Sequence, residues 1–120
     1  FDWAFPEVWR GLVLQGAEII CHPSNLVLPG LAQRAIPAYS LTNRVFIITA
    51  NRIGTEGNLT FTGMSIATNT LGQVISMAPH GEPVCAVFDV DPKEAQNKQV
   101  TCRNHLIQDR RPDVYSRYLP

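Results

Sequence analysis

The order of apolar and polar residues predicts a chain that passes repeatedly between helix and strand. Apolar residues recur at helical spacing within residues 7–15, which lie between Pro6 and Gly16. Proline at a first turn and glycine just past an end predict a short helix there. The unbroken apolar run at residues 17–21 predicts a strand buried on both faces. We expect residues 22–25 to end that strand in a loop.

A second helix and two further strands are predicted in the middle of the chain. Residues 31–44 have a helical pattern, but Pro37 removes a backbone donor and is expected to kink or split the helix. Residues 45–50 form the clearest strand pattern. Turn-forming residues at 54–58 then lead to an extended stretch at 59–62.

The pattern of the next segment is typical of a β-hairpin. Residues 65–70 and 73–77 are its arms, and Gly72 suits a positive dihedral angle in the turn. Residues 83–90 predict a last strand, and Asp91 is a plausible N-cap for a short helix after it. This order of helices and strands indicates an α/β (α+β) fold in a single domain.

The last twenty residues, 101–120, combine four arginines with two tyrosines and have little apolar periodicity. Arginine and tyrosine are enriched at protein interfaces. We therefore expect this segment to be an arm that packs against another subunit, with a disordered tail as the alternative.

Composition narrows the classes of function. The chain has 120 residues, of which 45 % are apolar, and ten basic side chains balance ten acidic ones. A chain without net charge lacks the electrostatic footprint that binds nucleic acid or an anionic membrane. Its longest strongly apolar stretch, residues 45–50, is far below the roughly 20 residues of a membrane span. We expect a soluble protein that binds neither nucleic acid nor membrane.

The three cysteines, Cys21, Cys85 and Cys102, match neither a disulfide framework nor a zinc site. Free thiols in a reducing cytoplasm are the simplest interpretation, and we expect neither a metal nor a cofactor. Cys21 lies beside His22, but consecutive side chains of a strand point to opposite faces and cannot pair. We expect Cys21 to be a buried structural thiol.

The sequence alone shows no complete active site, but it contains an ordered series of short motifs. They are residues 1–7 (FDWAFPE), 16–25 (GAEIICHPSN), 43–46 (NRVF), 50–54 (ANRIG), 63–65 (GMS), 71–74 (LGQV) and 109–115 (DRRPDVY). In this order they resemble the C-terminal half of the nitrilase superfamily, the carbon-nitrogen hydrolases. Residues 1–7 resemble the segment directly after that family's nucleophilic cysteine.

The resemblance implies part of an αββα sandwich that pairs into a larger sandwich in a homo-oligomer. It implies a thiol-dependent amidase that uses a cysteine, a glutamate base and a lysine and forms a thioester. The cysteine would directly precede Phe1, and all three residues would lie in a missing N-terminal half. We therefore expect residues 1–120 to be inactive alone. The alternative is a non-catalytic subunit or interaction module that keeps the fold.

The resemblance also assigns the wall of the site. The backbone N–H of Phe1 falls where the family stabilises the oxyanion. Trp3 and the loop of Ser24, Asn25 and Leu26 match positions that flank the substrate, although core packing is an equal alternative for Trp3. Glu7, Asn51 and Gly54 resemble structural supports.

Two neighbouring positions bear on the substrate, a small-molecule amide. True nitrilases commonly follow the cysteine with Trp-Glu, whereas this chain has Phe1 and Asp2. Relatives that take carbamoyl D-amino acids place two arginines at the positions of Trp3 and Ala4, where a guanidinium can hold a carboxylate. We expect a small neutral or cationic amide, unless another arginine such as Arg34 or Arg52 supplies the charge.

Overall fold

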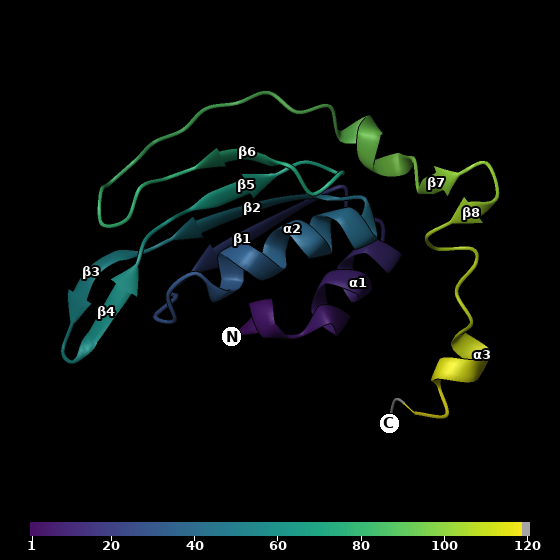
Figure 1. Cartoon of the computed structure of the whole chain (residues 1–120), viewed down its shortest axis with the longest axis horizontal. Coiled ribbons are helices and arrows are strands. Elements are labelled where there is room, and N and C mark those ends of the chain that lie inside the picture. The colour runs from purple at the N-terminus through teal and green to yellow at the C-terminus, as the bar shows by residue number, and fades with distance from the viewer. Residues whose placement is uncertain (119–120) are drawn as a thin grey trace.

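The structure is a computed structural model that describes residues 1–118. It contains short helices and short strands (Figure 1). In chain order they are η1 (Asp2–Ala4), α1 (Pro6–Leu14), β1 (Ile19–Ser24), α2 (Leu31–Asn43), β2 (Phe46–Asn51), β3 (Ile53–Glu56), β4 (Leu59–Thr62), β5 (Ile66–Thr68), β6 (Val74–Met77), η2 (Pro92–Gln96), β7 (Gln99–Thr101), β8 (Asn104–His105) and α3 (Pro112–Tyr115).

One four-stranded sheet organises the chain. Its strand order is β1-β2-β5-β6, with β1 parallel to β2 and the other neighbours antiparallel. The helices α1 and α2 lie together on one face of this sheet (Figure 1). The predicted α/β fold is confirmed, and the chain supplies one helical layer and one sheet layer.

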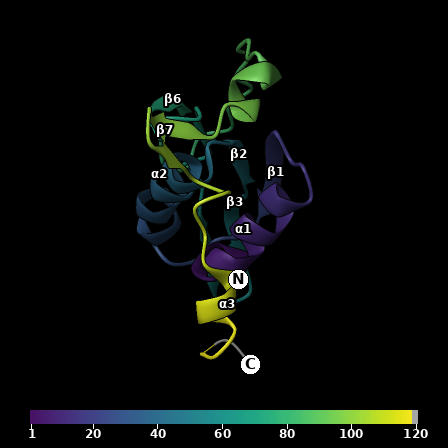
Figure 2. The ribbon, with the colours of Figure 1, turned by 90° about the vertical axis from the view of Figure 1, so that its right-hand side faces the viewer.

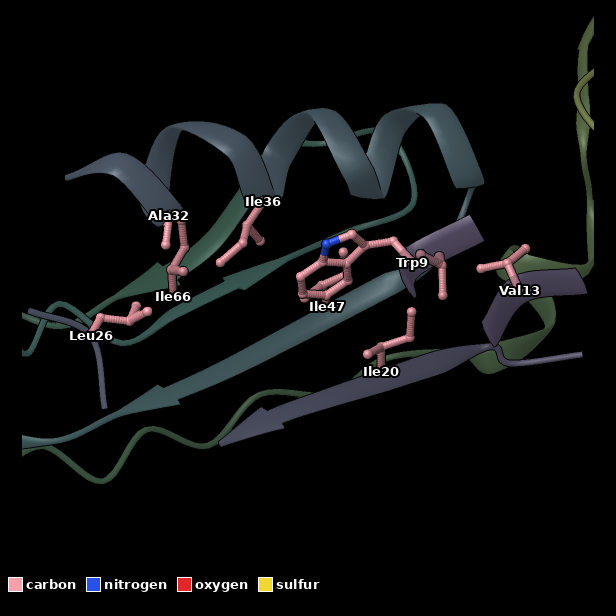
Figure 3. Close-up of a cluster of buried hydrophobic side chains, with 9 residues drawn as sticks. Trp9, Val13, Ile20, Leu26, Ala32, Ile36, Ile47 and Ile66 are labelled. Atoms are coloured by element: carbon pink, nitrogen blue, oxygen red, sulfur yellow. The ribbon is translucent and has the colours of Figure 1, made fainter. Parts of the chain in front are cut away.

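The core lies between those two layers (Figure 3). Trp9 of α1, Ile36 of α2 and Ile47 of β2 are at most 1 % exposed, and Ile20 and Ile66 extend the cluster along the sheet. Burying an aliphatic or aromatic side chain of this size stabilises a fold by roughly 1.5–3 kcal/mol. This contact holds the two helices in place above the strands.

Both predicted helices are present, and α2 is not split. Pro37 lies inside its thirteen residues. A helical proline costs about 3 kcal/mol, but Ile36 and Ser40 on either side of it are fully buried against the sheet. Packing of this face therefore outweighs the lost hydrogen bond, and of the two expected outcomes, a kink or a split, the split does not occur.

Strand β1 differs from its prediction in length and in burial. It begins at Ile19 and continues through Pro23, which pairs with Ala50, where we expected a loop. Proline is tolerated because β1 is the edge strand of the sheet. Cys21 is exposed and not buried as expected, because it points to the face that α1 and α2 do not cover.

Two further strand predictions need correction. Residues 54–58 were assigned to a turn, but residues 53–56 form β3, which pairs with β4 in a hairpin around Gly57. Residues 83–90 form no strand. They cross the uncovered face of the sheet, where Val84 and Phe88 line a cavity with Ile48, and no neighbouring strand is there to pair with them. The predicted hairpin of β5 and β6 is confirmed.

The C-terminal segment passes across one end of the sheet and of the two helices and reaches α3 (Figure 1, Figure 2). Asp91 caps η2 as predicted, by accepting a hydrogen bond from the Lys93 N–H at 3.0 Å. Lys98 fastens the start of the segment to the end of α2, since its Nζ donates to the carbonyls of Asn43 and Arg44 at 3.0 and 2.8 Å. Residues 119–120 of the predicted arm lie outside the described residues. Nowhere in residues 1–118 is there a helix with the length and apolarity needed to cross a bilayer.

Candidate active site

A cleft of about 320 Å³ lies between the first residues of the chain and the loop that follows β1. All five residues assigned to the site by resemblance line it: Phe1, Trp3, Ser24, Asn25 and Leu26. Asp2, His22, Pro23, Val27 and Leu28 complete the lining. The fold thus brings together two segments that are about twenty residues apart in sequence.

The first wall is built by the single turn of η1. The Ala4 N–H donates to the Phe1 carbonyl and the Phe5 N–H to the Asp2 carbonyl, both at 3.1 Å. The rings of Phe1 and Trp3 meet edge to face with centroids 5.5 Å apart. Trp3 is half-buried and packs against the core cluster while it lines the cleft, so both interpretations of Trp3 describe its position.

Asn51, at the end of β2, fixes the second wall. Its Oδ1 accepts from the Leu26 N–H at 2.8 Å, and its Nδ2 donates to the Gly63 carbonyl at 2.6 Å and to Thr62 Oγ1 at 3.1 Å. The Thr62 N–H donates in turn to the Leu26 carbonyl at 2.9 Å. Leu26 is therefore held through both of its peptide groups, which agrees with the supporting role expected of Asn51.

His22 is a residue of the cleft that the sequence analysis missed. Its Nδ1 lies 3.1 Å from Thr49 Oγ1, and its Nε2 lies 2.9 Å from Ser24 Oγ. Burial lowers the pKa of His22, and the nearby Asp2 carboxylate raises it in partial compensation. The uncharged imidazole is thus favoured near neutral pH. The period-two alternation of a strand, which puts His22 and Ser24 on one face, was the signal that could have found it.

The lining of the cleft combines uncharged side chains with one acidic side chain. Among the lining residues, all of which belong to the described part of the chain, Asp2 is the one carboxylate, and there is neither lysine nor arginine. The two arginines considered as alternatives lie elsewhere. Arg52 pairs with Glu56 at 2.6 Å and packs over the Phe61 ring at 4.3 Å, and Arg34 is exposed on α2.

Neither a metal cluster nor a thiol is present in the described part of this cleft. Residues 1–118 contain no group of three or more histidine, cysteine or acidic side chains that could hold a metal ion. Cys85 lines the separate cavity on the other face of the sheet, and Cys21 and Cys102 are exposed outside both cavities.

Comparison with known families identifies the family of the chain. The family model described as "Carbon-nitrogen hydrolase" matches residues 1–99. This chain belongs to the carbon-nitrogen hydrolase family. The family assignment made by resemblance is thereby confirmed.

The carbon-nitrogen hydrolase relatives are longer than this chain. It is 42 % identical to a nitrilase of Pyrococcus abyssi over 117 residues, and the matched region covers 98 % of this chain and 44 % of the relative. It is 29 % identical over 137 residues to N-carbamoylputrescine amidase of Oryza sativa subsp. japonica, covering 96 % and 43 %. The chain spans less than half the length of these relatives.

Solved carbon-nitrogen hydrolase structures share the fold. A carbon-nitrogen hydrolase of Helicobacter pylori G27 superposes with a TM-score of 0.82 at 22 % identity, over 99 % of this chain and 46 % of that one. An amidase of Nesterenkonia sp. AN1 superposes with a TM-score of 0.77 at 25 % identity, over 99 % and 41 %. That structure is of a mutant amidase in which the acetamide moiety of fluoroacetamide is covalently added at the active-site cysteine.

Proposed function

We propose that this chain is the C-terminal half of a thiol-dependent hydrolase of small amides and forms the substrate-binding wall of its active site. One observation carries the proposal: Phe1, Trp3, Ser24, Asn25 and Leu26, assigned from family motifs, line a single cleft. The family match and the amidase relatives support the same chemistry.

The proposed reaction places the nucleophile directly before Phe1. The thiolate of a cysteine at that position attacks the amide carbon, and the Phe1 backbone N–H donates to the oxyanion that develops on the carbonyl oxygen. Ammonia leaves with a proton from the upstream glutamate, and a thioester remains. Water then attacks the thioester and releases the carboxylic acid. The η1 turn serves this step by holding the peptide groups of residues 1–5 rigid.

The substrate that suits this cleft is a neutral or cationic amide. Among the lining residues that this chain supplies, a substrate carboxylate would meet Asp2 and no basic side chain. A cationic group would gain from Asp2 and from the face of an aromatic ring. The relative from Oryza sativa is an amidase of N-carbamoylputrescine. That name agrees with a substrate that carries a positive charge.

The complete gene product tests this proposal. We expect ammonia release from butyramide and from N-carbamoylputrescine with a kcat/KM at least tenfold above that for a carbamoyl D-amino acid. Replacing the cysteine before Phe1 with serine should abolish turnover of all three. A residue other than cysteine at that position, or equal turnover of the carbamoyl D-amino acid, would contradict the proposal. The former result would favour the non-catalytic subunit.

Nitrile hydrolysis is the second candidate, because the Pyrococcus abyssi relative, at 42 % identity, is named a nitrilase. Both reactions release ammonia and a carboxylic acid, so the substrate distinguishes them. A kcat/KM for butyronitrile above that for butyramide would make the nitrile the preferred substrate.

The same proposal covers the surroundings of the chain. The sheet face opposite α1 and α2 is covered in part by residues 84–88, and we propose that the N-terminal half of the αββα sandwich packs there. The proposed complete enzyme is a cytoplasmic homo-oligomer whose C-terminal arm lies across a partner subunit.

A further inference from the structure

The ring of His22 is held from several sides, and none of these contacts is explained by the reaction above. Trp9 meets it edge to face with centroids 5.1 Å apart, and Trp9 is itself stacked on Tyr39 at 5.2 Å and 14°. Thr49, which is 1 % exposed on the inner strand β2, lies 3.1 Å from Nδ1 through its Oγ1. The imidazole therefore has little rotational freedom.

The remaining polar contact of this ring is with the wall of the cleft. Ser24 Oγ lies 2.9 Å from Nε2 and 3.2 Å from Nδ1, so the hydroxyl is within hydrogen-bond distance of both ring nitrogens. Its other recorded partner, the His22 carbonyl, is 3.4 Å away and contributes little. Main-chain pairing holds the Ser24 backbone separately, because the Arg52 N–H donates to its carbonyl at 3.0 Å.

The backbone position of Ser24 and the orientation of its hydroxyl are therefore set by different contacts. The β1–β2 pairing sets where its backbone lies, and the His22 ring sets where its hydroxyl points. A side-chain hydroxyl without such a partner samples its three rotamers. A hydroxyl held in one rotamer can meet a substrate polar group without that loss of freedom.

We propose that His22 is a positioning residue of this active site, which acts by holding the Ser24 hydroxyl in the orientation that binds the substrate amide. The inference rests on the proposed function, since Ser24 matters only if the cleft binds substrate. The Trp9 and Tyr39 rings extend the support into the core, so α1 and α2 both determine the geometry of the cleft.

Substitutions at His22 in the complete enzyme test the inference. His22→Phe keeps a ring against Trp9 but removes both nitrogens. It should raise KM for butyramide about tenfold, which corresponds to about 1.4 kcal/mol, and change kcat less than about twofold. His22→Gln places an amide near the position of Nε2 and should restore a KM within threefold of the parent. His22→Asn reaches only toward Thr49 and should not.

The double substitution separates positioning from a general loss of structure. Ser24→Ala should raise KM as His22→Phe does, and the two together should be no worse than either alone, because both remove one interaction. Additive effects, or a parental KM in His22→Phe, would overturn the inference. If His22→Phe fails to fold by circular dichroism, Ser24→Ala with His22→Gln and His22→Asn carries the test, and equal KM values in the last two would overturn it.

The two proposals fail differently. A complete protein that hydrolyses no amide refutes the proposed function, and the role of His22 falls with it. An active parent whose His22→Phe variant is unchanged refutes the role of His22 alone.

Discussion

Replacing Asn51 with alanine tests how firmly the cleft wall is tied to the sheet. The substitution removes three side-chain hydrogen bonds, to the Leu26 N–H, the Gly63 carbonyl and Thr62 Oγ1. It leaves partners that are buried: Leu26 is 9 % exposed and Thr62 is 3 % exposed. A hydrogen bond contributes about 1 kcal/mol net, and an unpaired buried group costs about 1–3 kcal/mol.

From these values we expect Asn51→Ala to lower the free energy of unfolding by about 2–4 kcal/mol. The complete protein is unfolded in urea, and the change is read from the midpoint at constant slope. Asn58→Ala is the matched control. Asn58 lies exposed beside Gly57 in the turn between β3 and β4, no side-chain hydrogen bond to it is recorded within residues 1–118, and its change should stay within about 0.5 kcal/mol.

The same variant links stability to the site. In this variant the Leu26 N–H loses its acceptor, but the Leu26 carbonyl still accepts from the Thr62 N–H. The loop should therefore become more mobile while it remains attached to the sheet. KM for the amide substrate should rise. A loss of stability equal to that of Asn58→Ala would refute the reasoning, because it would mean that water replaces all three hydrogen bonds at no cost.

Three further predictions concern other parts of the chain. Burial lowers the pKa of His22 in the folded protein, so on acidification the unfolded state binds a proton at this imidazole before the folded state does. The free energy of unfolding should therefore fall as the pH drops below about 6.5. Urea titrations of the complete protein should show a smaller fall in His22→Gln. Gly72→Ala should cost more stability than Gly57→Ala, since both glycines have positive φ but only at Gly72 would a Cβ lie 2.5 Å from the Pro37 carbonyl oxygen; equal losses in calorimetry would contradict this steric term. Deleting residues 109–120 from the complete protein should lower its mass in light scattering, and an unchanged mass would remove the proposed interface arm.

The sequence predicted most accurately the helices and turns that are marked by proline or glycine residues at their own ends. Pro6 and Gly16 bracket α1, and Gly72 adopts the positive φ that its turn requires. The prediction failed where tertiary contacts decide. Pro37 stays in a continuous helix because the sheet packs against its neighbours, and residues 83–90 form no strand because strand-forming composition has no effect without a partner strand.

The candidate site shows the same division. Trp3 and Ser24 were assigned through motif resemblance, and their presence in one cleft depends on a fold that no spacing rule reveals. His22 was considered only as a partner for its neighbour Cys21. The strand alternation that excluded this pair also places His22 and Ser24 on the same face of the strand. The contacts with Thr49 and Trp9 come from two other elements and could not be predicted from the chain order.

The segment between β6 and η2 has a consequence for handling the protein. Residues 82–90 belong to no helix, strand or turn, and leave Val87 92 % exposed. Proteases bind their substrates as extended chains, so a subtilisin-like enzyme, which needs no basic residue at the cleavage site, should cut this stretch before it cuts α2. Protection of the same stretch in the complete protein would show by mass spectrometry, peptide by peptide, how much of it another part of the assembly covers.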